Sequence, residues 1–326
     1  MNLGPTVAVV IPSWNSLELL QPCLASLTEQ EVELETLVID NGSSDGTVSY
    51  LKREGVSHVS LPTNIGFARA LNLGAARVRT EAILALNADT VVEPGTVRAL
   101  LEALRMDTSL GGVQPRILQL DEGASDRDQA RLYSMGQALT RDGRAFELGA
   151  GETQSAEHLV PRQVFGVCGA SCLLRRELFD RLGGYDERYF SFYEDVDLNV
   201  RARIAGWRFA YVPEAVVWHV GNVSWLAEAP RPNAWNARLV ARNRIATQVK
   251  FMPLRSLPRI LAVEAGALLR AARHGRFRAT LRGKLEGLHL LPAMIHDRRR
   301  IRAEGSLIRA REWLGAGAAA PTPHEG

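Results

Sequence analysis

Cysteine and long apolar runs are scarce in this sequence, and we expect no leader segment. It has three cysteines among 326 residues, too few and too oddly numbered for a disulfide framework, and Cys168 and Cys172 lack the second pair that a structural zinc site needs. About five residues precede the first apolar segment, which leaves no room for a secretory signal. No run approaches the roughly 18 apolar residues of a membrane span. We therefore expect a cytoplasmic protein with reduced cysteines.

Two glycine-rich phosphate-binding motifs are also absent. The first apolar segment leads into Pro12-Ser13-Trp14-Asn15, without the Gly-x-Gly-x-x-Gly turn of a dinucleotide-binding site. No Gly-x-x-x-x-Gly-Lys-Ser/Thr loop is present either. The sequence therefore disfavours a dinucleotide-dependent oxidoreductase.

Positive charge is concentrated in one part of the chain. Residues 238–312 hold 18 lysines and arginines against 5 aspartates and glutamates, including the run Arg298-Arg299-Arg300, whereas residues 1–237 hold 21 against 30. The two parts are expected to meet different partners. An anionic membrane surface would explain the basic part, and so would a solvated helical face. Nucleic acid is the other alternative, but no zinc spacing or basic-aromatic motif supports it.

Apolar strand-like segments alternate with helical ones in the first third of the chain. The strands are expected at 7–11, 34–39, 56–61 and 82–86, with Ser16 and Asp45 able to cap two of the helices between them. Strands and helices at this spacing indicate an α/β fold with a parallel, Rossmann-like sheet and crossover helices on its faces.

The later segments are less regular. Residues 121–163 are expected to form loops or an antiparallel ribbon over the sheet, followed by a strand at 164–174, helices at 175–182 and 193–205, and two short strands at 209–212 and 215–219. Breaks at prolines and glycines divide the remainder into several helices. This pattern predicts an α/β domain at 1–237, a basic helical region at 238–314 and a disordered tail at 315–326.

Polar residues follow the ends of two predicted strands. Asp40 ends the second strand and Asp89 follows the fourth, so a parallel sheet brings both to one rim, where open sheets bind ligands. Asp40, Asn15, Asn64 and the amides near Gly66 could bind a nucleotide there. Each residue alone has a simpler explanation, since Asp40 could close an Asx turn.

Asp89 is also a candidate metal ligand. A carboxylate that enters a crevice beside a second oxygen ligand, here Asn87, suits Mg²⁺ or Mn²⁺, which share their coordination shell with water and substrate phosphates. The alternative is that Asn87-Ala88-Asp89 only caps the helix expected at 94–106.

Three carboxylates lie together in Glu194-Asp195-Val196-Asp197, at the start of a predicted helix. Successive helical residues are about 100° apart, so the three cannot all face one site. They could be only first-turn acids that suit the helix dipole. If the site is catalytic, one of them could act as a general base.

The order of these motifs resembles that of family 2 glycosyltransferases of the GT-A fold, most of all their rhamnosyltransferase-type members. The resemblance covers roughly residues 6–225 and rests on the following runs: Ile11-Pro12-Ser13-Trp14-Asn15, Asp40-Asn41-Gly42-Ser43-Ser44-Asp45-Gly46-Thr47, Asn64-Ile65-Gly66-Phe67, Asn87-Ala88-Asp89, Gly183-Gly184-Tyr185-Asp186 and Glu194-Asp195-Val196-Asp197. It departs from the family at Ala88, where proline is frequent, and at Asn87, which replaces the first acid of Asp-x-Asp.

The resemblance implies a GT-A-type mixed sheet with a helical extension, and an inverting transfer of a sugar, such as rhamnose, from a nucleotide-diphosphate sugar to a glycan or lipid-linked acceptor of cell-surface polysaccharide. Asp40 would contact the nucleoside, Asp89 and His219 the Mg²⁺ or Mn²⁺, and Asp195, with Glu194 beside it, would be the base. The nucleotide-sugar-binding set comprises Pro12, Trp14, Asn15, Asp40, Asn41, Asn64, Gly66, Phe67, Asn87 and Gly169.

Two other functions compete with this interpretation. A non-catalytic module that only holds a nucleotide sugar would keep Asp40 and Asn64 but would need no base, so Glu194-Asp195 argues against it. A nucleic-acid-binding protein would use the basic carboxyl-terminal region, but we expect that region to lie peripherally on the inner face of the cell membrane.

Overall fold

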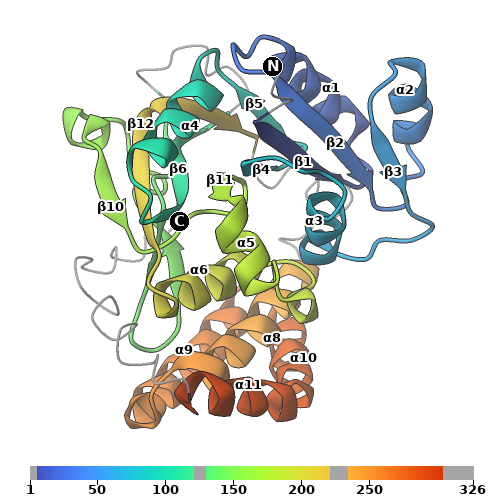
Figure 1. Ribbon diagram of the computed structural model, residues 1–326. Helices are drawn as coiled ribbons and strands as arrows, with labels where there is room; N and C mark the ends of the chain where they lie inside the picture. The colour runs from blue at the N-terminus through green and yellow to red at the C-terminus, as the bar shows by residue number, and fades with distance from the viewer. Residues whose placement is uncertain (1–5, 121–129, 221–233, 304–326) are drawn as a thin grey trace.

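The computed structural model describes residues 6–120, 130–220 and 234–303. A central sheet is covered by helices on both faces, and a further group of helices, orange to red in Figure 1, lies beneath one side of it. The predicted tail at 315–326 falls outside the described residues. Within the described part of the chain, no helix is both long enough and apolar enough to cross a bilayer. Cys23, Cys168 and Cys172 are buried and free, as predicted.

The amino-terminal half of the sheet is parallel, as predicted. Its strands are β1 (Val7–Ser13), β2 (Leu34–Asp40), β3 (His58–Ser60) and β4 (Ala82–Leu86). β1 pairs in parallel with both β2 and β4, and Ser13 lies opposite Asp40. The carboxyl ends of these strands therefore share one edge, and the loops that follow them meet there.

The other half of the sheet mixes directions. The overall order is β10-β12-β6-β11-β4-β1-β2-β3, with β5 against β12 and β7 against β6. These strands are β5 (Thr90–Val92), β6 (Leu110–Gln119), β7 (Leu132–Ser134), β10 (Arg162–Val164), β11 (Ser171–Arg175) and β12 (Arg208–His219). β11 runs antiparallel to both β4 and β6. The mixed GT-A-type sheet is thus present.

Two strand predictions were wrong in detail. The segments at 209–212 and 215–219 form one strand, β12, because both parts pair with β6 across an irregularity between Val212 and Val216. The segment at 164–174 is split between β10 and β11. The amides of Val167, Cys168 and Gly169 between them bind side chains rather than a neighbouring strand.

Apolar side chains of the strands alternate between two cores. Val7 and Val9 face the core covered by α1 (Leu17–Thr28), α2 (Thr47–Arg53) and α4 (Thr96–Met106). Ala8 and Val10 face the opposite core under α3 (Phe67–Ala75), α5 (Arg176–Leu182) and α6 (Glu194–Ile204). Burial of both strand faces explains why the sequence reads as continuous apolar runs.

The helix caps differ partly from the prediction. Ser16 precedes α1, but its hydroxyl bonds Ser13 and caps no backbone amide. Asp45 instead accepts the amide of Leu17 at 2.9 Å and, as predicted, that of Thr47 at the start of α2 at 3.1 Å. One carboxylate therefore anchors the beginnings of two helices.

The ribbon expected within 121–163 includes a short hairpin. β8 (Gln137–Leu139) pairs antiparallel with β9 (Ala145–Glu147), and a short 3₁₀ helix, η1 (Ala156–Leu159), follows. A second such turn, η2 (Glu187–Tyr189), leads toward α6. The hairpin brings residues distant in sequence to the edge where β1 and β4 end.

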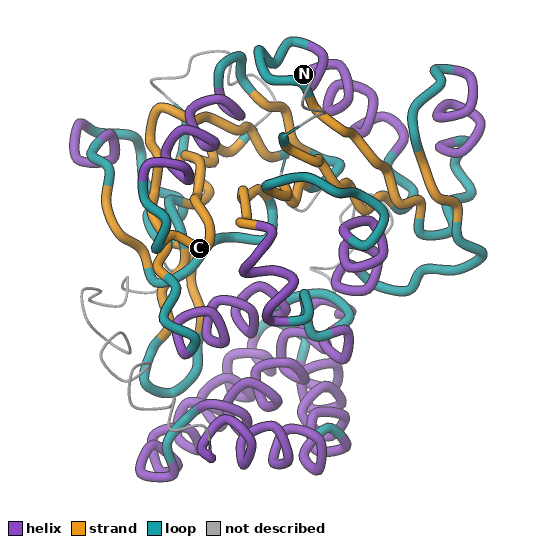
Figure 2. Tube along the Cα trace, in the orientation of Figure 1, coloured by secondary structure: helices purple, strands orange, loops and turns teal. Residues whose placement is uncertain are grey.

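The carboxyl-terminal region is helical, as predicted. It comprises α8 (Ala234–Phe251), η3 (Leu254–Ser256), α9 (Leu257–Arg273), α10 (Phe277–His289) and α11 (Leu291–Ala303), which lie together at the bottom of Figure 2. The predicted domain boundary at 237/238 falls within α8. Gly283 and Gly287 of α10 face backbone carbonyls of α8 so closely that added side chains would not fit.

Candidate active site

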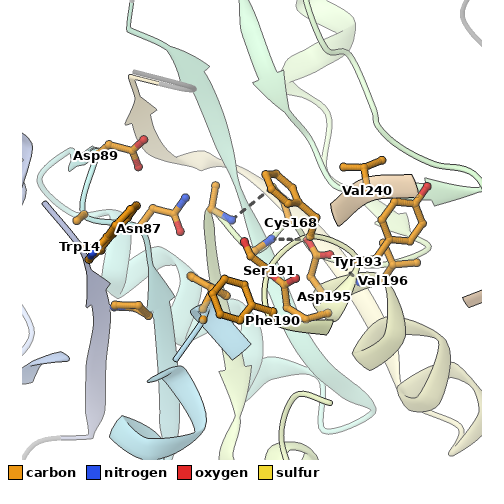
Figure 3. Close-up of a pocket in the computed structure, with 18 of the residues that line it drawn as sticks. Trp14, Asn87, Asp89, Cys168, Phe190, Ser191, Tyr193, Asp195, Val196 and Val240 are labelled. Carbon is orange, nitrogen blue, oxygen red and sulfur yellow. Dashed lines mark hydrogen bonds between the residues drawn. The ribbon is translucent and has the colours of Figure 1, made fainter. Parts of the chain in front are cut away.

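A cavity of about 370 Å³ lies at the sheet edge where β1 and β4 end. Figure 3 shows Trp14, Asn87 and Asp89 on one side of it and Asp195 and Tyr193 on the other. We name these the donor wall and the acceptor wall, after the roles proposed for them below. The donor wall comprises Pro12, Trp14, Asn41, Asn64, Gly66, Phe67, Asn87 and Asp89, and the acceptor wall comprises Gln137, Glu147, Gly169, Phe190, Phe192, Tyr193, Glu194 and Asp195.

Asparagine side chains shape the donor wall by binding nearby backbone. Asn64 Oδ1 accepts the amide of Gly66 at 2.8 Å, and Asn41 Oδ1 accepts that of Ile65 at 3.3 Å. Asn15, at φ 47°, accepts the amide of Ser44 at 2.8 Å. Asn15 does not line the cavity but ties the loop after β1 to the loop after β2. These bonds pre-form the rim, so a ligand need not order it.

Asp40 lies behind the rim. Its side chain is buried and accepts the amide of Ser43 at 3.3 and 3.4 Å. It does not line the cavity in this structure, whereas its neighbour Asn41 does. The observed bonds tie Asp40 to its own loop, so the predicted contact of Asp40 with a nucleoside remains a prediction.

Asp89 and His219 meet at the same edge. His219 Nε2 lies 3.1 Å from Asp89 Oδ1 and 3.4 Å from Asn87 Nδ2. The pairing of His219 with Thr90 across β12 and β5 brings the two together. The His219 ring also packs edge-on against Tyr133. A carboxylate oxygen and an imidazole nitrogen this close together are a suitable pair of ligands for a divalent ion.

Asp195 is the least buried of the three acids at the start of α6. Its Oδ2 accepts the Gly169 amide at 2.9 Å and Gln137 Nε2 at 2.7 Å, and its Oδ1 accepts the amide of Val196 at 2.7 Å. Burial raises its pKa, while these hydrogen bonds act in the opposite direction. Position 169 leaves little room for a side chain, since a Cβ added to Gly169 would lie 3.2 Å from Asp195 Oδ2.

Glu194 and Asp197 have different surroundings. Glu194 is buried, its Oε2 has no hydrogen-bond partner among the described residues, and burial followed by the charge of Asp195 raises its pKa well above the usual value. Asp197 points away from the cavity, as predicted, and pairs with Arg201 and Lys250. Of the three acids, Asp195 alone combines exposure to the cavity with donors that stabilise an ionised form.

Sequence reasoning missed Gln137 and Glu147, which come from the β8–β9 hairpin. Gln137 Nε2 donates to both Glu147 Oε1 (2.9 Å) and Asp195 Oδ2 (2.7 Å). Glu147 also accepts the Ser134 hydroxyl at 2.5 Å. Burial and the charge of Asp195 raise the pKa of Glu147 to about 7. No strand or helix periodicity marks this stretch, and the sequence carried no signal for it.

A second group of possible metal ligands overlaps the acceptor wall. One oxygen each from Glu147 and Asp195 and the Sγ atom of Cys168 lie within 4.8 Å of one another. Burial raises the pKa of the Cys168 thiol well above its usual value, so the thiol stays protonated. Both carboxylates already accept hydrogen bonds from Gln137. This group is therefore poorly suited to bind a cation, which needs free anionic ligands.

The loop before α6 has an unusual backbone. Phe190, Phe192 and Tyr193 all have φ between 66° and 69°, a conformation that costs about 1–3 kcal/mol for each residue without a compensating contact. Asn243 of α8 supplies one, since its Nδ2 lies 2.7–2.8 Å from the carbonyl oxygens of Tyr189, Ser191 and Phe192. The acceptor wall is therefore held in place from the carboxyl-terminal helices.

Comparison with known proteins agrees with this architecture. The family model described as "Glycosyltransferase like family 2" matches residues 5–244. The fold is that of a GT-A glycosyltransferase. The chain belongs to glycosyltransferase family 2, which confirms the predicted family and fold.

Two relatives illustrate the range of the family. The chain is 33% identical over 237 residues to N-acetylglucosaminyl-diphospho-decaprenol L-rhamnosyltransferase of Mycobacterium tuberculosis, covering 66% of this chain and 75% of the relative. It is 29% identical over 231 residues to an N-acetylglucosaminyltransferase of Mesorhizobium japonicum, covering 65% of this chain and 50% of that protein.

Solved structures share the fold at low sequence identity. GalNAc-T7, crystallised with UDP, GalNAc and Mn²⁺, has a TM-score of 0.58 at 16% identity, over 77% of this chain and 49% of that one. The mannosyltransferase PcManGT of Pyrobaculum calidifontis, in complex with GDP-Man and Mn²⁺, has a TM-score of 0.51 at 20% identity, over 95% and 86% of the two chains.

Proposed function

We propose that this enzyme transfers a sugar, with inversion, from a nucleotide-diphosphate sugar to a hydroxyl of a glycan or lipid-linked acceptor. The carrying observation is one cavity lined by Asp89 at one wall and by Asp195 at the other, with His219 buried behind Asp89. Rhamnose is the first donor sugar to test, because the Mycobacterium tuberculosis relative is named a rhamnosyltransferase that acts on a decaprenol-linked substrate.

The proposed reaction needs a base and a stabilised leaving group. Asp195 takes the proton of the acceptor hydroxyl as that oxygen bonds to the anomeric carbon, while the bond from this carbon to the diphosphate breaks. Attack from the face opposite the leaving group inverts the anomeric configuration. Gly169 and Gln137 keep Asp195 ionised and directed into the cavity.

Asp89 and His219 would hold a Mg²⁺ or Mn²⁺ ion, and Asn87 lies beside them. Asp89 Oδ1 and His219 Nε2 already lie 3.1 Å apart. Two protein ligands suit an ion that completes its coordination shell with water and phosphate oxygens. When bound, the ion would stabilise negative charge on the departing diphosphate. Trp14, Asn41 and Asn64 line the same wall and would contact the nucleotide.

The decisive experiment is a donor screen. Purified enzyme is incubated with dTDP-, UDP- and GDP-sugars, with Mg²⁺, Mn²⁺ or excess chelator, and released nucleotide is measured with and without a polyprenyl-diphosphate sugar acceptor. We expect acceptor-dependent, metal-dependent release with one donor, and NMR of the product should show the inverted anomer. Tight binding of a donor without any turnover would instead identify a nucleotide-sugar-binding module.

We also propose that α9 and α10 place the enzyme against an anionic membrane, on the cytoplasmic side. Seven large apolar residues on these helices are at least 36% exposed: Leu257, Leu261 and Leu269 on α9, and Phe277, Leu281, Leu285 and Leu288 on α10. The α10 members recur at helical spacing and so share one face. An ion pair of Lys284 with Glu264 holds the two helices side by side.

Arginines accompany this apolar face. Arg255, Arg270, Arg273 and Arg278 are exposed, and each cation near anionic lipid contributes about 1 kcal/mol. The predicted cluster Arg298-Arg299-Arg300 is only partly available, because Arg298 is buried and donates to the carbonyls of Val249 and Met252. Exposed leucines framed by arginines are typical of helices that lie in a membrane interface.

Vesicle co-sedimentation tests this surface. Binding should need phosphatidylglycerol in phosphatidylcholine vesicles and should weaken with salt, because exposed charges are screened over about 8 Å at physiological ionic strength. The double variant Leu261→Ser and Leu285→Ser should bind less, whereas Met106→Ser, which alters an equally apolar and exposed residue on α4, should not. Equal binding to neutral and anionic vesicles would overturn the proposal.

A further inference from the structure

A chain of side-chain amides crosses from the protein interior to Asp195. Asn199 of α6 is fully buried. Its Oδ1 accepts the amide of Val167 at 3.2 Å and its Nδ2 donates to the Val167 carbonyl at 2.8 Å. Backbone groups therefore fix which way the Asn199 amide points, since an exchange of its oxygen and nitrogen would place like groups together.

The orientation of Asn199 determines that of Gln137. Asn199 Nδ2 also donates to Gln137 Oε1 at 2.8 Å, so the Nε2 group of Gln137 must face the other way. There it donates to Asp195 at 2.7 Å and to Glu147 at 2.9 Å. Both hydrogens of one buried amide are thus used to hold two carboxylates of the acceptor wall beside each other.

We propose that Glu147 and Gln137 are positioning residues that set the proton affinity of Asp195 in opposite directions. The inference rests on the proposed function, in which Asp195 is the base. The charge of Glu147 disfavours ionisation of Asp195, whereas the hydrogen bond from Gln137 favours it. Together they keep the base ionised at neutral pH and still able to accept a proton.

The other titratable groups near this pair are Tyr133, Cys168, Cys172, Tyr185 and Glu194. Burial raises the pKa of the two hydroxyls and the two thiols above their usual values, so these four stay neutral near pH 7. Burial also raises the pKa of the Glu194 carboxyl. Gln137 holds Glu147 and Asp195 beside each other, so the ionisation of one changes the proton affinity of the other.

The test compares the pH dependence of kcat/KM in two variants. Glu147→Gln removes a negative neighbour, so the acid limb should move to lower pH. Gln137→Leu removes a hydrogen bond to the ionised base, so the acid limb should move to higher pH. Each shift should be about 1 pH unit. Glu152→Gln, on the same segment but paired with His158 and half exposed, is the matched control and should overlay the wild type.

Calorimetry with the nucleotide donor accompanies the profiles. Both variants should bind donor like the wild type, because they alter the acceptor wall alone. Profiles that coincide with the wild type, or that shift in the same direction, would overturn the inference while leaving the proposed transfer intact. Loss of all transfer in Glu147→Gln with donor binding retained would also overturn it, since Glu147 would then act directly on the acceptor. Absence of transfer by the wild type would count against the proposed function itself.

Discussion

The donor wall and the acceptor wall of the cavity are built in different ways. The donor wall follows the ends of parallel strands, and its asparagines bind backbone amides only two to about thirty residues away, as Asn64 does with Gly66. The acceptor wall joins a hairpin, the start of α6 and the strained loop before it, and it is held by Asn243 from α8. The loop backbone of the donor wall is fixed mainly by these nearby bonds, although Asp89 also meets the distant His219, whereas the acceptor wall depends on contacts distant in sequence.

This difference predicts that variants of the two walls have separable effects. Changes to the donor wall should alter metal or donor binding, and changes to the acceptor wall should alter turnover while donor binding persists. The predictions below test that separation.

The largest expected effect is that of Asp195→Asn. Loss of a positioned base costs on the order of 10² to 10⁴ in rate, while donor affinity should remain near that of the wild type because the base meets only the acceptor. Turnover assays and calorimetry with donor measure the two quantities. Retained transfer in Asp195→Asn together with its loss in Glu194→Gln would assign the role to Glu194.

On the donor wall, Asp89→Asn should abolish most metal-dependent activity. Two neutral amides would stand where a dication must bind, and the loss of several kcal/mol of charge stabilisation corresponds to roughly 10²- to 10³-fold in rate. Metal titration and calorimetry with the nucleotide-sugar donor should show that Asp89→Asn binds both the metal ion and the donor more weakly than the wild type does. Full turnover of the variant, or of the wild type in excess chelator, would remove the metal assignment.

Asn243→Ala tests the support of the acceptor wall from α8. The carbonyls of Tyr189, Ser191 and Phe192 would lose their shared donor, which should lower the free energy of unfolding by about 1–3 kcal/mol and reduce kcat more than donor affinity. Thr247→Val is the control, because Thr247 bonds the Tyr189 hydroxyl and not the loop backbone. Equal loss of kcat in both variants would contradict a specific role of Asn243 in the loop.

The smallest effect concerns stability against pH. The pKa of Glu147 is raised from 4.5 to about 7 in the folded protein, so the native state binds more protons between these values and the free energy of unfolding falls as pH rises through them. Glu147→Gln cannot titrate. The free energy of unfolding of the variant, relative to that of the wild type, should rise by on the order of 2 kcal/mol between pH 5 and pH 8 in urea denaturation. If the variant and the wild type differ in free energy of unfolding by the same amount at pH 5 and pH 8, the raised pKa of Glu147 is refuted.

The sequence was most informative where chemistry follows regular structure. Asp89 and Asp195 lie beside an apolar strand and at a helix start, so strand order and helical periodicity suffice to place them. Asp40 was identified at the correct edge, but only the structure shows that its carboxylate closes a turn behind the cavity. Gln137 and Glu147 could not be found, because their strands have three residues each and are positioned by bonds to distant side chains.

The left-handed turn at Phe190, Phe192 and Tyr193 also bears on when the enzyme becomes active. A chain folds from its amino terminus as it is synthesised, so the strands that carry the donor loops can pair well before residues 234–251 are made. Until α8 docks, the turn lacks the three bonds from Asn243, and in the proposed function a nucleotide sugar could bind beside an unfinished acceptor wall. A helix made after the whole sheet is therefore needed to complete the acceptor wall.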